Sequence, residues 1–394
     1  MLRSLGSIVK CIVLRNVARC GECLHSCAPE TTPHPIHIKL FATKNVMPSI
    51  HRAPVSPKVL ASLDLGFFKP LIAWTFEPIS KPIEPVLGGW DEIDGLPEHL
   101  TAFFQADPNP FNSRFGSGSS AAVCKGYIDF NGMTYVVAAK ERYFGGESSQ
   151  DVMLEEFAGK ISREVKVLRR LKHPNIVNYL GVALGVPRHG HNQLSIITSV
   201  CDRGGLPSYV SHAPNCQRLS LALDIAHALE YLHENNIVHG QLKPRNISIT
   251  NSGAGVKAVL CDFSCARIIG DDGFVPWSSK DGSYRYTPQE IARPSDSNPV
   301  YVSKEGDIYA FAFVALFILS GKEALECDGR INVWDVSYRL LNGERPLRKD
   351  HEGSDLTDVV WSLLESCWSP EATKRPSAAS VVSTLTSLPT VRGV

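Results

Sequence analysis

Apolar and polar residues follow two different periods along the chain, and the change from one to the other divides a folded domain into two parts. From about residue 113, short β-rich runs come first, AAVCKGYIDF and MTYVVAAK. A long amphipathic helix and more strands follow, and from about residue 205 helical patterns dominate. A small strand-rich part before a larger helical part predicts an α+β architecture, and no internal repeat is visible.

The long amphipathic pattern VMLEEFAGKISREVKVLRRLKH carries an acid, Glu164, on its apolar side. The apolar stripe consists of Leu154, Phe157, Ile161, Leu168 and Leu171. A carboxylate on an inward face is costly unless a cation or hydrogen-bond donors meet it there. Lys140, which closes the strand YVVAAK and shares a face with Ala138, is the nearest upstream candidate partner. The alternative is that both long side chains reach water.

The longest apolar run, YAFAFVALFIL at residues 309–319, predicts a fully buried helix. Eleven residues are too few to span a bilayer, so no membrane span is expected. Forty Lys plus Arg balance forty Asp plus Glu, and the neutral chain has no general attraction to nucleic acid. Eleven scattered cysteines, an odd number, indicate reduced thiols in an intracellular compartment.

Thirteen of the 26 prolines fall between Pro29 and Pro110, so residues 1–112 are expected to be mostly extended or irregular. Residues 1–63 carry eight Lys or Arg against two acids. The expected location is cytoplasmic, with this segment as an unstructured basic tail. The alternative is a mitochondrial protein in which residues 1–30 form a transit peptide, which the helically spaced apolar residues near the start resemble. The run CGEC at residues 20–23 matches no standard zinc-finger spacing.

The run FGSGSSAAVCKGYI contains a glycine-rich turn. Gly116 and Gly118 permit a close approach of backbone amides to a phosphate, and Val123 follows as an apolar cover for a base. A dinucleotide-binding turn needs a helix opening within the glycines, whereas a second strand follows here. The pattern therefore favours a hairpin flap, and the alternative is a flexible loop.

The run VLCDFSCARIIG places Asp262 directly after an apolar strand. Mg²⁺ is usually held by one or two carboxylates together with substrate phosphates, so this acid is a candidate metal ligand. Asn246, in the run IVHGQLKPRNISI, offers a neutral oxygen for a second site. The alternative for Asp262 is an ordinary turn former.

These motifs together resemble a protein kinase domain. In chain order they are GSGSSAAV, Lys140, Glu164, HPNIV, VHGQLKPRN, CDFS, GSYRYTPQE, GDIYAFAFVALFILSGK and CWSPEATKRPS. The resemblance covers residues 113–388 and implies a bilobal fold. Its parts are an N-lobe at 113–198, a hinge at 199–201, a C-lobe at 202–388 and a tail at 389–394. The motifs are closer to serine/threonine kinases, and to the tyrosine-kinase-like group among them, than to tyrosine kinases.

The resemblance implies ATP and Mg²⁺ as cofactors and a protein as substrate or signalling partner. It assigns Lys140 to the α and β phosphates and Glu164 to holding Lys140. Asn246 and Asp262 correspond to the Mg²⁺ ligands.

The same resemblance places an adenine site on the strands. Val123 and Ala138 correspond to the residues that cover the base. In TSVC, residues 198–201, Thr198 corresponds to the gatekeeper, and Ser199 and Cys201 to the residues whose backbone faces the base.

Further positions correspond to structural parts of the family. Leu168, His239 and Phe263 match stacked apolar positions. Glu290 and Arg375 match an ion pair that braces the helical lobe.

The chain departs from the family in the catalytic loop, which reads His239, Gly240, Gln241 in place of His-Arg-Asp. A glutamine amide accepts a hydrogen bond but cannot hold a proton near neutral pH, so the general base is missing. General-base assistance is worth about 10²- to 10⁴-fold, whereas phosphoryl transfer depends mostly on positioning and charge stabilisation. Lys243 is retained for contact with the transferring phosphate. The sequence therefore favours an ATP-binding pseudokinase that acts as a scaffold or allosteric partner, and the alternative is a slow serine/threonine kinase.

Overall fold

The computed structural model describes most of the chain after residue 94. The described residues are 95–107, 114–117, 121–142, 150–188, 191–212, 217–253, 255–271, 274, 284–293, 301–325 and 333–388. The basic N-terminal segment, the CGEC run and Gly118 lie outside them. The basic-tail and transit-peptide interpretations of the N-terminal segment therefore stay predictions.

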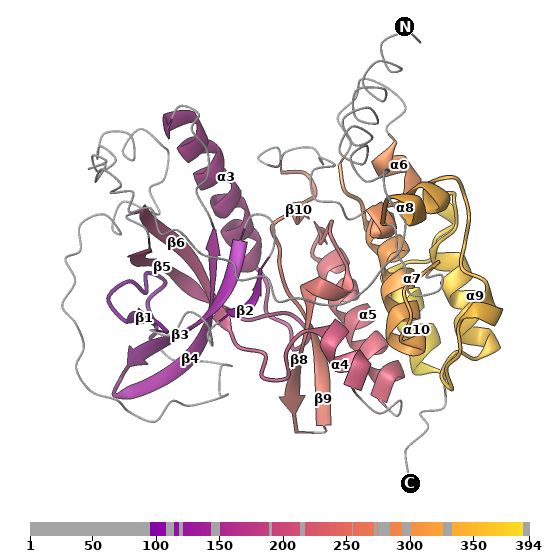
Figure 1. The fold of residues 1–394 in the computed structure, drawn as a ribbon, viewed down its shortest axis with the longest axis horizontal. Coiled ribbons are helices and arrows are strands. Elements are labelled where there is room, and N and C mark those ends of the chain that lie inside the picture. The colour runs from indigo at the N-terminus through magenta and orange to yellow at the C-terminus, as the bar shows by residue number, and fades with distance from the viewer. Residues whose placement is uncertain are drawn as a thin grey trace, which may run out of the picture. The chain divides into compact units, whose positions relative to one another are not determined.

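The N-lobe is built on one antiparallel sheet, which has six strands within the described residues (Figure 1). Its strands are β1 (Phe104–Ala106), β2 (Arg114–Ser117), β3 (Ala121–Phe130), β4 (Met133–Arg142), β5 (Tyr179–Arg188) and β6 (His191–Ser199). The order is β1-β3-β4-β6-β5, with β2 also paired to β3. Asn131 and Gly132 connect β3 to β4 with φ angles of 52° and 78°. Positive φ at both central residues gives the twist that a tight hairpin needs.

The predicted amphipathic helix is α3 (Gln150–Leu168), which lies beside the sheet in Figure 1. Ile161, Val165 and Leu168 are buried in the same hydrophobic core as Val182 and Ile196 of the sheet. Leu171 is also buried but lies beyond the end of the helix. The apolar stripe thus continues into the turn that follows α3.

The C-lobe is mainly helical and has two small two-stranded sheets within the described residues. Its helices are α4 (Leu206–His212), α5 (Arg218–Glu234), α6 (Gln289–Ala292), α7 (Lys304–Ser320), α8 (Val333–Leu341), α9 (Asp358–Cys367) and α10 (Ala378–Thr386). Short 3₁₀ turns cover Pro244–Asn246, Tyr284–Tyr286, Arg348–Asp350 and Ala372–Lys374. The two sheets pair β7 (Ile237–Val238) with β10 (Arg267–Ile268), and β8 (Ile247–Ser252) with β9 (Gly255–Leu260). α5 packs against α7 and α10, as Figure 1 shows.

The predicted buried helix is α7, at the centre of the C-lobe. Every residue from Gly306 to Leu319 is buried. The Ser303 hydroxyl accepts the Gly306 N–H at 3.0 Å and caps the first turn. Gly321 ends the helix in a left-handed conformation with φ of 75°. Within the described part of the chain, no helix combines the length and apolar character that crossing a membrane requires.

Within the described residues, one strand precedes residue 113, where the kinase-like domain was expected to begin. β1 pairs with β3, and its Phe104 lies opposite Ile128. Leu100 and Phe104 are buried on the sheet with Ile128, Val137 and Ile197. A segment of the proline-rich region thus contributes to the hydrophobic core of the N-lobe.

Candidate functional site

Lys140 of β4 joins two acids that come from different parts of the chain. Its Nζ lies 2.6 Å from Glu164 Oε1 of α3 and 2.5 Å from Asp262 Oδ1 beyond β9. The Glu164 side chain is 2% exposed and that of Lys140 is 13% exposed. Two buried opposite charges are tolerable when each meets its partner directly. The structure therefore brings together the acid and the cation that the sequence pattern paired.

Asp262 adopts a backbone conformation that is uncommon for a residue other than glycine, with φ of 58°. For aspartate, backbone of this kind is found in turns and at functional sites. The Ser264 N–H donates to its Oδ1 at 3.3 Å. Burial acts to raise the pKa of Asp262, but the Lys140 ammonium outweighs burial and holds that pKa well below its ordinary value. Asp262 is therefore a carboxylate at neutral pH.

The loop that contains Gln241 is anchored by Asp307, an acid inside α7. His239 N donates to Asp307 Oδ2 at 2.8 Å, and Gly240 N donates to Asp307 Oδ1 at 2.9 Å. Gly240 has φ of 74°, and a Cβ on it would lie 2.7 Å from the carbonyl oxygen of Cys265. Glycine thus suits this position in both backbone conformation and space.

Gln241 and Asn246 are hydrogen-bonded to each other. Asn246 Nδ2 donates to the Gln241 carbonyl at 2.9 Å and to Gln241 Oε1 at 3.4 Å. Cys261 N donates to the Asn246 carbonyl at 2.8 Å, which ties Asn246 to the residue before Asp262. Lys243 lies between Gln241 and Asn246 in the same loop, in an extended conformation. The catalytic loop therefore holds Gln241, Lys243 and Asn246, and Asn246 is hydrogen-bonded to the residue before Asp262.

The expected base-covering residues share one face of the N-lobe sheet. Val123 lies opposite Lys140, and Ala138 lies opposite Thr198. Paired residues and alternate residues along a strand point to the same side, so these side chains lie on the Lys140 face. Gly116 in β2 lies opposite Val123, and a second strand follows the glycines as the hairpin prediction requires.

The hinge is tied to both neighbouring segments. Ser199 N donates to the Asn178 carbonyl at 2.9 Å, so the carbonyl of Ser199 is the part of its backbone that can meet a ligand. On the other side of the hinge, the neighbouring Cys261 thiol and burial raise the pKa of Cys201, so the Cys201 thiol is protonated at neutral pH.

His239 and Phe263 pack edge to face, with ring centroids 5.1 Å apart. Both side chains are buried, as is Leu168 of α3. His239 Nε2 faces the Cys261 carbonyl at 3.2 Å, and its Nδ1 accepts the Gln241 N–H at 3.3 Å. A carbonyl only accepts hydrogen bonds, so Nε2 carries the proton of the neutral ring. Burial lowers the pKa of His239.

Comparison with known families agrees with this arrangement. The family described as "Protein kinase domain" matches residues 111–385. The chain belongs to the protein kinase family. This membership accounts for the β-rich N-lobe, the helical C-lobe and the order of the motifs.

Similar kinases come from both the serine/threonine and the tyrosine type. The chain is 25% identical over 330 residues to "Serine/threonine-protein kinase CTR1" of Arabidopsis thaliana, which covers 78% of this chain and 37% of that protein. It is 26% identical over 318 residues to "Serine/threonine-protein kinase VIK" of the same plant, covering 79% and 65%. It is 26% identical over 276 residues to "Tyrosine-protein kinase hopscotch" of Drosophila melanogaster, covering 69% and 22%. The chain thus spans between about a fifth and two thirds of the length of these three relatives.

An ion pair braces the C-lobe of the kinase domain away from Lys140. Arg375 Nη1 and Nη2 lie 2.6 Å and 3.1 Å from the two carboxylate oxygens of Glu290. Arg375 also donates to the carbonyls of Ser369 at 2.9 Å and Glu305 at 3.0 Å. Its side chain is 1% exposed. This pair therefore acts on the structure of the lobe, as the resemblance implied.

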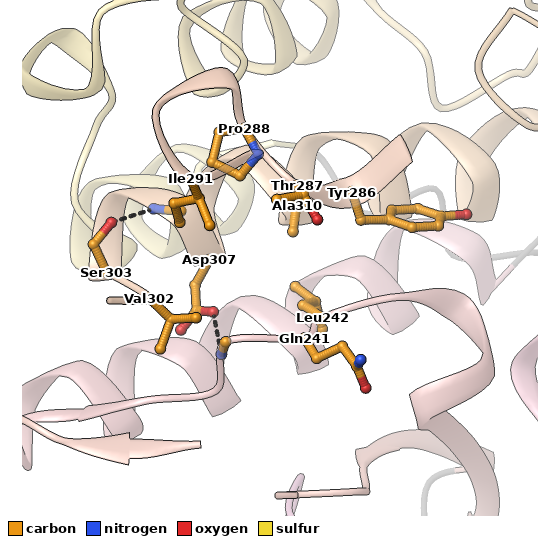
Figure 2. A pocket seen from close by; sticks show the side chains of 12 residues that line it. Gln241, Leu242, Tyr286, Thr287, Pro288, Ile291, Val302, Ser303, Asp307 and Ala310 are labelled. Atoms are coloured by element: carbon orange, nitrogen blue, oxygen red, sulfur yellow. Dashed lines mark hydrogen bonds between the residues drawn. The ribbon is translucent and has the colours of Figure 1, made fainter. Parts of the chain in front are cut away.

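A pocket of about 390 Å³, which includes space open to solvent, lies beside Gln241. It is lined by Gly240–Leu242, by Tyr286–Pro288 and Ile291, and by the start of α7. Figure 2 shows Asp307 reaching from α7 to the backbone at Gly240.

Asp307 is the residue of this site that the sequence analysis missed. It lies in GDIYAFAFVALFILSGK, next to the apolar run of α7. Like Glu164, Asp307 is an acid within an apolar pattern, and a buried acid requires hydrogen-bond donors or a cation. That signal was present in the sequence.

Proposed function

We propose that the kinase domain of this chain binds ATP with Mg²⁺ and transfers phosphate poorly or not at all. In this proposal it acts on other signalling proteins as a scaffold or allosteric pseudokinase. The observation that carries the proposal is Lys140, which contacts both Glu164 and Asp262 while glutamine stands at position 241. The parts needed to hold a nucleotide are present together, and the proton acceptor is not.

The phosphates of ATP are assigned to Lys140 and to the glycine-rich turn. Glu164 fixes the Lys140 ammonium in one place, which lowers the entropy lost when a phosphate binds. Gly116 and Gly118 are assigned to the flap over the phosphates because a residue without a side chain lets backbone N–H groups come close.

The adenine is assigned to the Lys140 face of the N-lobe sheet. Val123 and Ala138 cover the base, with Thr198 beside them as gatekeeper. The Ser199 carbonyl and the backbone of Cys201 meet its polar edge. This orientation of the hinge is supported by the Ser199 N–H, which donates to the Asn178 carbonyl and leaves the Ser199 carbonyl for the base.

Asp262 and Asn246 are assigned to Mg²⁺, and their chemistry fits that ion. Mg²⁺ prefers oxygen ligands and is commonly bound by one or two carboxylates plus substrate phosphates. Asp262 supplies a carboxylate whose pKa is lowered by Lys140. The Asn246 Nδ2 is bonded to Gln241, so its amide oxygen lies on the other side of the group. When bound, the ion neutralises charge on the phosphates.

Gln241 limits the chemistry without disturbing the loop that carries it. Asp307 holds the backbone of His239 and Gly240, and Asn246 holds Gln241 itself. An amide in place of the carboxylate removes about 10²- to 10⁴-fold of general-base assistance. Binding of ATP does not require that group, so the proposal combines retained binding with impaired transfer.

The alternative is a slow serine/threonine kinase, and this alternative is supported by the position of Gln241 Oε1. This oxygen is held at 3.4 Å from Asn246 Nδ2 and can accept a hydrogen bond from a substrate hydroxyl. Lys243, in the same loop, is assigned to the transferring phosphate. In this alternative the proton leaves to solvent or to the phosphate.

The test uses the full chain and measures binding and transfer separately. The Kd for ATP is measured by calorimetry with Mg²⁺ and with chelator, and transfer of labelled γ-phosphate to generic protein substrates is measured alongside. Gln241→Asp restores the missing base, and Gln217→Asp, the same change at the start of α5, is its matched control.

We expect Mg²⁺-dependent binding, little transfer by the native chain, and transfer gained in Gln241→Asp but not in Gln217→Asp. Robust transfer by the native chain replaces the pseudokinase proposal with the alternative. If ATP with Mg²⁺ does not bind, the assignments of Lys140, Asn246 and Asp262 to ligands are wrong.

A further inference from the structure

A segment before the expected kinase domain packs on the outer face of the N-lobe sheet. We call residues 95–107 the strap. Leu100 and Phe104 of the strap are buried with Val137 and Ala139 of β4. Val137 and Ala139 alternate with Ala138 and Lys140, so the strap covers the face opposite Lys140.

The strap is hydrogen-bonded to β3 on one side of the sheet and to β5 on the other. Its C-terminal part is β1, which pairs with β3. Its earlier part runs beside β5, where Val182 N donates to the Glu98 carbonyl at 2.9 Å and Leu100 N donates to the Val182 carbonyl at 2.8 Å. The backbone polar groups of two outer strands are thus paired by one segment.

Two glycines of the sheet make room for the strap. A Cβ on Gly181, whose φ is 155°, would lie 2.3 Å from the Glu98 carbonyl oxygen. A Cβ on Gly126 would lie 2.4 Å from the ring of Phe104. These distances are shorter than non-bonded atoms allow, so β3 and β5 are both built to accept the strap.

The strap also contacts the end of α3 through one carboxylate. Glu98 accepts hydrogen bonds from Nε and Nη2 of Arg169, the first residue after α3. It also accepts the Tyr179 hydroxyl at 2.9 Å. The bond to Glu98 raises the pKa of Arg169. Arg169 N donates to the Val165 carbonyl at 3.0 Å, so Arg169 continues the hydrogen-bonding of the helix.

We propose that Glu98 is a positioning residue for the nucleotide site, which acts through Arg169 to keep Glu164 of α3 against Lys140. The inference rests on the proposed function, because it is the ATP site that this ion pair serves. Glu164 lies five residues before Arg169, about 7.5 Å along the helix axis.

The physical basis is the short range of the pair that α3 supplies. A Lys140–Glu164 bond of 2.6 Å is lost when the helix moves by more than about 1 Å, and Glu164 is then a buried acid without its cation. Lys166 Nζ pairs with Asp271 Oδ2 at 2.5 Å and holds the same helix from the segment after Asp262. Glu98 holds it from the strap.

The first test removes the charge of Glu98 in the full chain and reads out Lys140 directly. Glu98→Gln keeps the size of the side chain. Glu344→Gln is the matched control, because Glu344 accepts the same two hydrogen bonds from Nε and Nη2 of Arg339 in the C-lobe. The rate at which an amine-reactive acylating reagent labels Lys140 is measured without nucleotide, and the Kd for ATP with Mg²⁺ is measured separately.

We expect Glu98→Gln to raise both the labelling rate of Lys140 and the Kd by about threefold to fivefold, the range of a partly exposed ion pair. Glu344→Gln should change neither. Equal labelling of Lys140 in Glu98→Gln and the native chain overturns the inference.

A double-mutant cycle separates positioning from general stability. If Glu98 acts through Glu164, then Glu98→Gln adds nothing to the labelling rate of Lys140 in a Glu164→Gln background. If Glu98→Gln raises the labelling rate of Lys140 by the same factor in the native and the Glu164→Gln backgrounds, Glu98 does not act through Glu164 and the proposal is contradicted.

A second variant displaces the strap by its backbone. Gly181→Ala places a methyl group against the Glu98 carbonyl, whereas Gly253→Ala meets no atom within 4 Å and serves as its control. We expect faster Lys140 labelling in Gly181→Ala alone, and unchanged labelling in a folded Gly181→Ala protein counts against the strap.

The two proposals fail in different ways. If the native chain does not bind ATP but Glu98→Gln still accelerates Lys140 labelling, the proposed function is wrong and the positioning role stands. If the native chain binds ATP and Glu98→Gln changes neither measurement, the positioning role is wrong and the proposed function stands.

Discussion

Lys140 forms ion pairs with two carboxylates in the site that we assign to the nucleotide. Glu164 is buried and depends on this cation for its compensation, and the pKa of Asp262 is lowered by it. Removing one partner of a buried ion pair leaves the other charge unpaired, which typically costs about 3 to 5 kcal/mol.

We therefore expect Lys140→Met to lower the free energy of unfolding by about 3 kcal/mol, near the lower end of that range because Asp262 is partly exposed. Urea denaturation followed by fluorescence measures this change. Lys125→Met, on the same face of the sheet in β3, is the control and should cost well under half as much, because its ammonium lies over the ring of Tyr127 rather than in a buried ion pair. Equal losses in the two variants would show that Glu164 does not depend on Lys140.

His239 gives the loop a dependence on pH whose sign follows from its hydrogen bonds. The ring donates from Nε2 and accepts at Nδ1, so it fits the fold in its neutral form. Its pKa is lowered by burial from an ordinary value of 6.5, whereas the unfolded chain takes up a proton near 6.5. The contribution to stability is complete above pH 6.5 and is lost as the pH falls below it.

The free energy of unfolding should thus fall between pH 7.5 and pH 5.5, about one unit on either side of that ordinary value, and fall less in His239→Leu. His173, whose pKa is also lowered by burial, contributes equally to both proteins and cancels in the difference. Identical pH dependence in the two proteins would mean that His239 is not the titrating group.

At the scale of the element, α7 holds the catalytic loop as well as filling the C-lobe. Asp307 in its first turns accepts two backbone N–H groups of the loop and lies 3.1 Å from His233 Nε2. Its side chain is buried, so each lost acceptor leaves a donor unsatisfied.

Asp307→Asn keeps the shape of the side chain but replaces one acceptor oxygen with a donor. We expect it to lower the free energy of unfolding by about 2 to 3 kcal/mol and to speed hydrogen exchange at His239 and Gly240. Asp335→Asn, an exposed change in α8, should stay within about 0.5 kcal/mol. Unchanged hydrogen exchange at His239 and Gly240 would show that Asp307 of α7 does not hold the catalytic loop.

At the scale of the whole molecule, the Lys140–Asp262 contact joins β4 of the N-lobe to the segment after β9 of the C-lobe. A ligand that binds Lys140 and Asp262 together stabilises the two lobes together. At a hundredfold excess over its Kd, such a ligand adds about 2.7 kcal/mol to the free energy of unfolding.

ATP with Mg²⁺ at that excess should therefore raise the melting temperature by roughly 5 °C for a domain of this size. Differential scanning calorimetry measures the shift. In Lys140→Met, the shift caused by ATP with Mg²⁺, measured against the melting temperature of the ligand-free variant, should be mostly lost. A full shift in that variant would place the nucleotide away from Lys140.

The sequence predicted the parts of this kinase domain that depend on local pattern. Short β-rich runs predicted β3 and β4, the helical stripe predicted α3, and the run at residues 309–319 predicted the buried α7. An acid inside an apolar stripe also predicted that Glu164 needs a cation. These are short-range signals, because each depends on residues that are neighbours in the chain.

Only the tertiary structure decided which distant segments meet. The strap lies in a proline-rich region with no strand signal, and its place on the sheet depends on Gly126 and Gly181, which remove atoms that would exclude it. The Glu98–Arg169 contact and the anchoring of Gly240 by Asp307 also depend on distant partners. A sequence pattern records what each segment must bury or pair, whereas the partner is chosen by packing all segments in one volume.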